Sequence, residues 1–319
     1  RVNDNNGNLM KSYTIGTGAS SLNIGNPLYK GTLNSKDGSN YTTITENFQV
    51  DYRQNDNWRF NARVGYNQQN TATDFFRSAL HTDYLNVSPT SAEYLNRGTY
   101  RITNAFQKAY TVDLSAIYNK VIGKHEFYFN GILTANENVT EMNGMSMVGF
   151  PNDELNNISM GKQYQEGTKA LGTENTVRVA AATAALNYVL DRRFLVDASF
   201  RRNASSQYGR NAKWGNFWSL GAGWNLHEEE FVRNLGWVDL FRITANTGVT
   251  GTPPGQNAYQ ALATYNYILD RTYNGDMGLE LMALANPNLQ WQKVAETNYR
   301  AEFGFLNRFN ASFDYYIKN

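Results

Sequence analysis

The chain has 319 residues, and its 29 Lys and Arg residues nearly balance 28 Asp and Glu residues, giving a formal net charge of +1. This balance provides no overall field for nucleic acid, and the absence of cysteine excludes disulfide scaffolds, thiolate metal sites and thiol catalysis. Aromatic residues at 14% combined with only 18% charged residues are typical of β-barrels with wet interiors.

The sequence begins at Arg1 with neither a methionine nor an apolar leader. We therefore expect either that a signal peptide has been removed or that the chain is a fragment. No run of eighteen apolar residues is present, so the sequence predicts no transmembrane helix, while the alternating strands of a membrane barrel escape this criterion.

Alternation of apolar and polar residues with a period of two predicts strands along most of the chain. A first short strand is expected at residues 13–17. The predicted strand pairs that follow are residues 44–53 with 58–67, 110–118 with 127–133, 177–189 with 194–200, 218–226 with 240–248, and 295–305 with 309–317. This gives roughly eleven strands of about ten residues, the length a tilted strand needs to cross a bilayer. Single-chain bacterial barrels have even strand numbers, so we expect further strands outside this sequence.

The connections between these strands alternate in length. Short polar turns lie near Asn55, Gly123, Asp191 and Asn307. The connections on the other side are long and comprise residues 68–108, 136–175, 204–216 and 249–292. This asymmetry predicts short periplasmic turns and long extracellular loops.

The two faces of the predicted strands differ in chemistry. Aromatic residues crowd the apolar face beside the short turns, as in an interfacial girdle, with Trp58, Tyr118, Tyr188 and Phe309 as examples. The opposite face carries charged residues such as Arg63, Asp113, Asp197 and Glu302, which would be costly in a dry core and suit a hydrated lumen. The pattern favours an all-β fold, a transmembrane antiparallel β-barrel, over a soluble β-sandwich.

The stretch FWSLGAGWNL (residues 217–226) combines strand alternation with two glycines in the strand interior. On the barrel interpretation, the residues facing lipid are Trp218, Leu220, Ala222, Trp224 and Leu226. Gly221 and Gly223 then face inward, where they leave room for close backbone approach or for a plug.

Searches for catalytic and metal motifs find none. HEEEF (residues 227–231) has Phe231 where a zincin would have its second histidine, so a solvated turn with a short amphipathic helical piece is favoured. No Walker, GxGxxG or nucleophile-elbow pattern occurs. We therefore expect no enzymatic activity, no bound metal and no cofactor.

The long loops hold the candidate ligand-binding residues. TDFFRSALHTDYL (residues 73–85) combines aromatic rings with hydrogen-bonding groups, as a saccharide or extended peptide requires, and its candidates are Phe75, Phe76, Arg77, His81, Asp83 and Tyr84. The alternative, that these rings pack the loop on itself or against a partner protein, is left open. Arg201, Arg202 and Tyr208 near the predicted outer mouth are interpreted first as residues that fix the loop and second as ligand contacts.

Several stretches, in the same order and spacing, resemble the SusC/RagA-type TonB-dependent outer-membrane transporters of Bacteroidota. The strongest are RRFLVDASFRRNASSQYG (residues 192–209), KWGNFWSLGAGWNLHEEEF (residues 213–231) and LFRITANTGVTG (residues 240–251), and residues 25–52 and 285–306 add to them. The family usually has Pro where Trp218 stands and Asp-Gly where Asn203-Ala204 stand. These departures concern loop details and leave the fold unaffected.

The resemblance implies that residues 1–319 form part of one transmembrane domain, a roughly 22-stranded barrel filled by a plug. The resemblance also implies that the plug, the TonB box and the final strands lie outside this sequence. The implied function is active import of a glycan or oligopeptide across the cell outer membrane. The implied partners are a SusD-like surface lipoprotein, the TonB-ExbB-ExbD complex and outer-membrane lipid, without nucleic acid. The alternatives are a passive porin, a structural or secretion-associated barrel, a soluble carbohydrate-binding β-domain and an outer-membrane enzyme.

Overall fold

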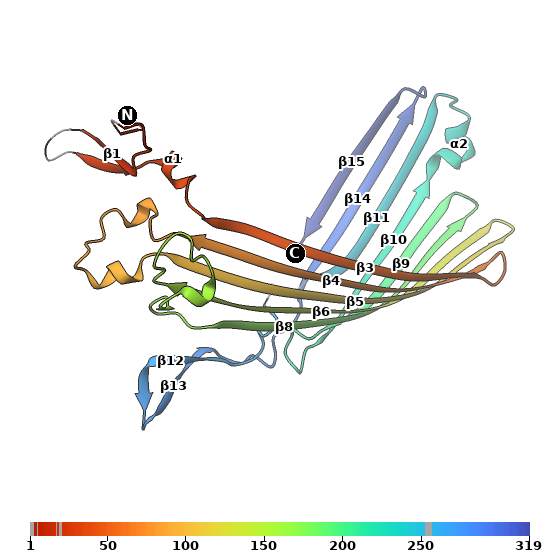
Figure 1. Cartoon of the computed structure of the whole chain (residues 1–319). Helices are drawn as coiled ribbons and strands as arrows, with labels where there is room; N and C mark the ends of the chain where they lie inside the picture. Colours follow the sequence, from red (N-terminus) through yellow and green to blue (C-terminus); the bar gives the residue numbers. More distant parts are fainter. Residues whose placement is uncertain (1–2, 5, 17, 19–20, 253–256) are drawn as a thin grey trace. The chain divides into compact units, whose positions relative to one another are not determined.

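The protein is an antiparallel all-β chain, shown in Figure 1 as a computed structural model that describes residues 3–4, 6–16, 18, 21–252 and 257–319. Its main sheet has the strand order β15-β14-β11-β10-β9-β8-β6-β5-β4-β3, with the short β7 paired to β6. Strands that are adjacent in this sheet are consecutive in the chain, except where short strands in the connections intervene. Among the described residues the order does not close into a ring. The bounds are β3 (Lys36–Arg53), β4 (Trp58–Arg77), β5 (Thr99–Ile122), β6 (His125–Val148), β7 (Gln163–Tyr164), β8 (Leu171–Leu190), β9 (Phe194–Ser205), β10 (Trp214–Asn225), β11 (Val238–Thr252), β14 (Gln292–Phe305) and β15 (Phe309–Lys318).

The remaining elements are short and lie in the connections. Two hairpins stand apart from the main sheet, β1 (Ser12–Ile15) with β2 (Leu22–Gly25) and β12 (Thr264–Tyr273) with β13 (Asp276–Ala283). The helical pieces are α1 (Pro27–Lys30), η2 (Thr82–Tyr84), η3 (Ala92–Asn96), η4 (Ile158–Met160), η5 (Leu226–Glu228) and α2 (Glu230–Arg233). The strand expected at residues 13–17 is represented by β1, which ends at Ile15, and Thr17 lies outside the described residues. Because β1 belongs to a small separate sheet, it was wrongly counted among the barrel strands.

All five predicted strand pairs are present. The expected length of about ten residues fits β9, β10 and β15, which have 12, 12 and 10 residues, but it is too short for the others. β5 and β6 each have 24 residues and β4 and β8 each have 20. The strands extend into segments rich in Thr, Asn and Gln that were expected to be loops. Backbone hydrogen bonds continue there without an apolar face, so alternation no longer signals the strand.

The predicted short turns are also present. Asp191 and Arg192 in the β8–β9 turn have φ of 52° and 58°, and Leu306 and Asn307 in the β14–β15 turn have φ of 55° and 48°. Two successive residues with positive φ match the right-handed twist of a hairpin. In the β3–β4 turn, Oδ1 of Asn55 instead accepts hydrogen bonds from the backbone N–H groups of Asn57 and Trp58, both at 2.9 Å.

The chain divides into two compact units, each described separately. The first comprises Arg1–Ile44, Gln68–Lys108 and Val139–Glu174, and the second comprises Thr45–Asn67, Ala109–Asn138 and Asn175–Asn319. In the first unit a small core forms where the rings of Phe76, Tyr100 and Phe150 meet, with centroids 5.3 to 6.0 Å apart.

The second unit consists largely of sheet with two chemically distinct faces. Across β9, β10 and β11, Phe200, Trp218 and Val249 stand in register on the face predicted to contact lipid, and we call this the outer face. The side chains of Trp218, Leu220 and Trp224 are 46%, 50% and 40% exposed, as expected for a surface that contacts lipid. Leu226 departs from the prediction: it begins η5 and is only 7% exposed, because the chain leaves the strand there.

The opposite face, called the inner face, carries polar side chains. One row places Asp197, Gly221, Asn246 and Asn298 in register across four strands. Two ion pairs also lie on this face, Arg63 with Asp113 at 3.0 Å and Arg242 with Glu302 at 2.6 Å. These charged groups pair with one another, as a hydrated lumen permits.

Candidate functional site

A cavity of about 420 Å³ lies on the inner face of the second unit, at the end of the strands where the long connections begin. Its position follows from strand alternation, because Arg201 and Phe217 are register partners on β9 and β10 and both point away from the outer face. The cavity is lined by Val179, Arg201, Asn203, Ser205, Gln207, Phe217, Thr250, Gly251 and Trp291. Aromatic surface therefore lies beside a guanidinium and two side-chain amides.

One wall of the cavity is an aromatic cluster formed by Tyr208, Phe217 and Trp291, all nearly buried. The Trp291 ring lies 4.3 Å from the ring of Tyr208 and 5.5 Å from that of Phe217, the latter edge-on. Trp291 Nε1 donates to the carbonyl of Lys213 at 3.1 Å, and the Tyr208 hydroxyl donates to the carbonyl of Thr252 at 3.1 Å. Both polar ring atoms are thus satisfied by backbone, which fixes the rings in place.

Glycines make room for this cluster. A Cβ on Gly251 would lie 2.2 Å from the Phe217 ring, and a Cβ on Gly215 would lie 2.7 Å from the same ring. A Cβ on Gly209 would meet the carbonyl oxygen of Pro287 at 2.1 Å. The absence of side chains at these positions allows the β9–β10 connection and the segment before β14 to approach each other.

The three candidates from this region take different positions. Arg201 lines the cavity, and its Nε donates to Oδ1 of Asn203 at 2.7 Å. Arg202 points to the outer face, where its guanidinium lies 4.7 Å from the ring centre of Trp214. Tyr208 is 4% exposed and supports the cavity wall. The two arginines were predicted together as candidate site residues, although neighbouring strand residues face opposite sides and alternation places only Arg201 on the polar face.

The six candidates that were predicted to lie in a loop belong to the first unit. The prediction was wrong for Phe75, Phe76 and Arg77, which form the end of β4, because the strand continues into the segment expected to be a loop, and the other three lie at η2. Phe76 is 1% exposed and belongs to the small aromatic core. Arg77 pairs with Asp83 at 2.8 Å, and the Phe75 ring lies 5.3 Å from the Arg77 guanidinium. The Tyr84 hydroxyl lies within hydrogen-bonding distance, 3.2 Å, of the Thr99 hydroxyl.

His81 caps the short helix η2. Its Nδ1 accepts a hydrogen bond from the backbone N–H of Asp83 at 3.2 Å, which requires the unprotonated nitrogen. Burial is the main cause that lowers the pKa of His81, opposed by the Asp83 carboxylate. These contacts hold the side chains of residues 75–84 against one another. The side chains of Arg77 and Asp83 are partly exposed, so their polar atoms remain the candidates for ligand contact.

Sequence reasoning missed Phe217, Trp291, Asn203 and Gln207. Phe217 carried a signal, because it is a large apolar residue in the row predicted to face water. Trp291 comes from a distant connection, and no local pattern places it beside β10.

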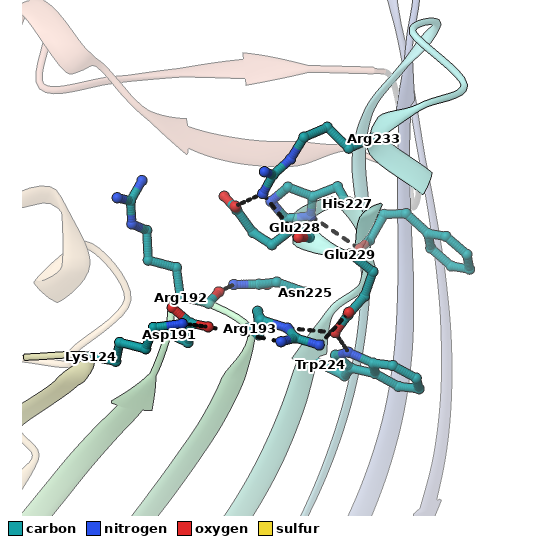
Figure 2. A network of polar contacts seen from close by, with 11 residues as sticks. Lys124, Asp191, Arg192, Arg193, Trp224, Asn225, His227, Glu228, Glu229 and Arg233 are labelled. Atoms are coloured by element: carbon teal, nitrogen blue, oxygen red, sulfur yellow. Dashed lines mark hydrogen bonds and ion pairs between the residues drawn. The ribbon is translucent and has the colours of Figure 1, made fainter. Parts of the chain in front are cut away.

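A second polar arrangement lies at the short-turn end of the second unit (Figure 2). Arg193, next to the β8–β9 turn, donates from Nε to Glu229 Oε1 at 2.8 Å and from Nη2 to Oε2, while Trp224 Nε1 donates to Glu229 Oε1 at 2.9 Å. Lys124 Nζ donates to Asp191 Oδ2 at 2.8 Å. His227 Nδ1 donates to the carbonyl of Phe241 at 3.1 Å. These residues, called the turn network, brace neighbouring turns.

The charges of the turn network have clear effects on titration. Hydrogen bonds from Arg193 and then from Trp224 lower the pKa of Glu229. The hydrogen bond from Lys124 lowers the pKa of Asp191. A cavity of about 1120 Å³ beside these residues contains both acidic and basic groups. Among the described residues, no group of three or more His, Cys, Asp or Glu side chains is arranged to hold a metal ion.

The helices of the described residues are all too short or too polar to cross a membrane. The search of family models finds no match. Among curated proteins, the chain is 31% identical over 180 residues to TonB-dependent receptor P39 of Formosa agariphila, which covers 56% of this chain and 17% of that protein. It is 26% identical over 301 residues to TonB-dependent receptor P3 of the same organism, a match that covers 92% of this chain and 28% of that protein.

A third curated relative is the TonB-dependent receptor SusC of Bacteroides thetaiotaomicron, 29% identical over 157 residues, or 47% of this chain and 15% of that protein. The chain thus spans under a third of the length of these relatives. These relatives are named as receptors and not as enzymes.

Solved structures agree on the fold. The RagAB peptide importer in its closed-closed state aligns with a TM-score of 0.79 and 23% identity, covering 98% of this chain and 33% of the other. The siderophore receptor PiuA from Acinetobacter baumannii aligns with a TM-score of 0.50 and 11% identity, covering 88% of this chain and 40% of the other. At these identities the likeness concerns the arrangement of the strands.

Proposed function

Because the chain belongs to the SusC/RagA-type TonB-dependent receptors of the outer membrane, we propose that it forms part of an importer that takes up a glycan or an oligopeptide. In this proposal residues 1–319 contribute strands to one transmembrane barrel. The short turns face the periplasm and the long connections face outward. A SusD-like surface lipoprotein assists capture, and TonB energises transport through parts of the protein outside this sequence.

The observation that supports import best is the inner-face cavity bounded by Arg201, Phe217 and Trp291. It lies on the inner face, at the end of β9, β10 and β11 where the long connections begin. Arg201 offers charge-assisted hydrogen bonds to a carboxylate or hydroxyl, and the rings offer an apolar surface to a sugar face or a side chain. No catalytic chemistry is required of these groups, because they only bind and orient.

The proposal is tested on the complete receptor, purified from its native membrane with any bound material. We expect mass spectrometry to detect oligopeptides or oligosaccharides, which also decides the substrate class. The double substitution Arg201→Gln with Asn203→Ala is expected to lower the affinity for the recovered material by roughly tenfold, through the loss of a charged hydrogen-bond donor. Arg192→Gln, an arginine at the short-turn end, is the matched control and leaves affinity unchanged.

Energised import is separated from passive diffusion by uptake measurements in cells. Dissipating the proton gradient is expected to stop uptake of the recovered material. Uptake that continued at the same rate would identify a passive porin and overturn the proposal.

A further inference from the structure

A second hollow lies in the second unit on the outer face, opposite to the candidate ligand cavity. It has a volume of about 560 Å³ and opens between Tyr110 and Trp214, with Ala180 and Ala204 between them. Ala180, Ala204 and Trp214 are register partners on β8, β9 and β10. The small side chains of the two alanines leave the space, and the aromatic rings form its walls.

Strand register places this hollow at the end of the outer face that adjoins the long connections. Moving along β9 toward the long connections, the outer-face residues are Phe200, Arg202 and Ala204. Phe200 pairs with Trp218 in the apolar band, whereas Arg202 lies with its guanidinium over Trp214. Successive outer-face residues are about 7 Å apart along a strand, so the apolar surface gives way to cations within about two such steps.

Basic groups surround the apolar part of the hollow. Arg178 and Lys213 line it directly, and Arg202 lies beside its Trp214 wall. Arg178 contacts Glu137 through Nε, yet its side chain is 68% exposed, so the rest of the guanidinium is accessible. Three cations against the Glu137 carboxylate give this site a net positive charge beside an apolar hollow.

We propose that this outer-face hollow binds a lipid of the outer leaflet that carries anionic phosphate. An acyl chain lies against Tyr110, Ala180 and Trp214, and the phosphate lies at Arg178 and Lys213. Arginine and lysine at a membrane interface keep their charges in the headgroup region while their stems follow the apolar surface, and guanidinium groups match phosphate geometry. This inference rests on the orientation proposed above, with the long connections outside, and not on the identity of the imported solute.

The test measures binding of bis-phosphorylated lipid A to the complete receptor in detergent micelles, with dephosphorylated lipid A as the comparison. The receptor is expected to prefer the phosphorylated form by roughly twenty-five-fold, because each of two basic side chains near the headgroup contributes roughly fivefold. Arg178→Gln with Lys213→Gln is expected to reduce this preference to about twofold or less. The control, Lys169→Gln with Arg210→Gln, removes two exposed charges elsewhere and retains it.

A second variant tests the apolar part without changing charge. Ala204→Leu fills the hollow from an outward-facing position and is expected to weaken binding of the phosphorylated lipid, while circular dichroism shows the same strand content. Equal binding of both lipid forms by the unmodified receptor would overturn the inference. So would a second receptor copy or a lipoprotein cross-linked at Lys213 in the purified complex. Solute uptake is measured in parallel, and its failure alone would affect only the proposed function.

Discussion

At the scale of single residues, glycine positions define the candidate ligand cavity. Gly215 and Gly251 leave space for the Phe217 ring, which would collide with a Cβ at either position. Trp291 then packs edge-on against Phe217 from a distant segment. The position of the Phe217 ring in the inner wall therefore requires glycine at both positions.

Gly251→Ala is expected to displace the Phe217 ring, because the new Cβ would lie 2.2 Å from it. Overpacking of this kind costs about 1–3 kcal/mol. The displaced ring would loosen the contact with Trp291, so hydrogen exchange should accelerate around Leu289 and Trp291. Gly172→Ala is the matched control, since nothing lies within 4 Å of a Cβ there. Equal exchange in the two variants would show that Phe217 can yield without disturbing the wall.

The glycines in FWSLGAGWNL differ from one another in a way that alternation could not reveal. Both were expected to leave room on the inner face. A Cβ on Gly221 would meet only ordinary contacts, the nearest being Asn246 Cβ at 3.4 Å. A Cβ on Gly223 would lie 3.0 Å from both Leu195 Cδ1 and Thr244 Cγ2. At Gly223 cross-strand side chains occupy the space, and neither close backbone nor a plug does, so the expectation was wrong there. Those neighbours are known only once register is known. Room for a plug at Gly221 stays a prediction.

At the scale of elements, the turn network joins the β8–β9 turn to the connection between β10 and β11. Glu229 is its centre, with hydrogen bonds from Arg193 and Trp224 and a side chain only 10% exposed. The sequence predicted a solvated turn with a short helical piece at HEEEF, and α2 confirms the helical piece. The burial of Glu229 was missed, because it depends on Arg193, which is 36 residues away in sequence.

Glu229→Gln is expected to loosen these turns, because a neutral amide replaces the carboxylate that accepts from both Arg193 and Trp224. Backbone amide exchange at Arg193 and Asn225 should accelerate severalfold, since both amides lie at the braced turn. Glu230→Gln removes the same charge from the adjacent exposed position and serves as the control. If both variants exchanged alike, net charge and not the paired contacts would explain the effect.

The turn network should also respond to acid. The folded-state pKa values of Glu229 and Asp191 lie below their ordinary values of 4.5 and 3.8, so below those values the unfolded state binds more protons than the folded state. The stabilisation is therefore fully present above the ordinary values and is lost as pH falls through the lowered folded-state values. Exchange protection at Arg193, corrected for intrinsic rates, is expected to be constant from pH 7 to about 5 and to decrease toward pH 3. In Glu229→Gln the decrease should be smaller.

At the scale of the whole molecule, alternation predicted the main antiparallel sheet because lipid on one side and water on the other impose it on every crossing. The five strand pairs, their order and the short turns follow from that constraint. The long connections carry no such constraint. The β12–β13 hairpin, the packing of Phe76 with Phe150 and the position of Trp291 arise from contacts between segments far apart in sequence. The candidate cavity could therefore be predicted only in part, through Arg201.

The proposed orientation can be tested directly, because this chain contains no cysteine. Lys169→Cys in the β7–β8 connection and Asp56→Cys in the β3–β4 turn place single thiols at exposed positions on opposite kinds of connection. In intact cells producing the complete receptor, a membrane-impermeant maleimide should label Lys169→Cys and leave Asp56→Cys unlabelled until the outer membrane is opened. Both variants should label equally in detergent, which shows that each thiol is reactive. The reverse pattern in intact cells would put the short turns outside, and the binding surfaces assigned to the long connections would then face the periplasm.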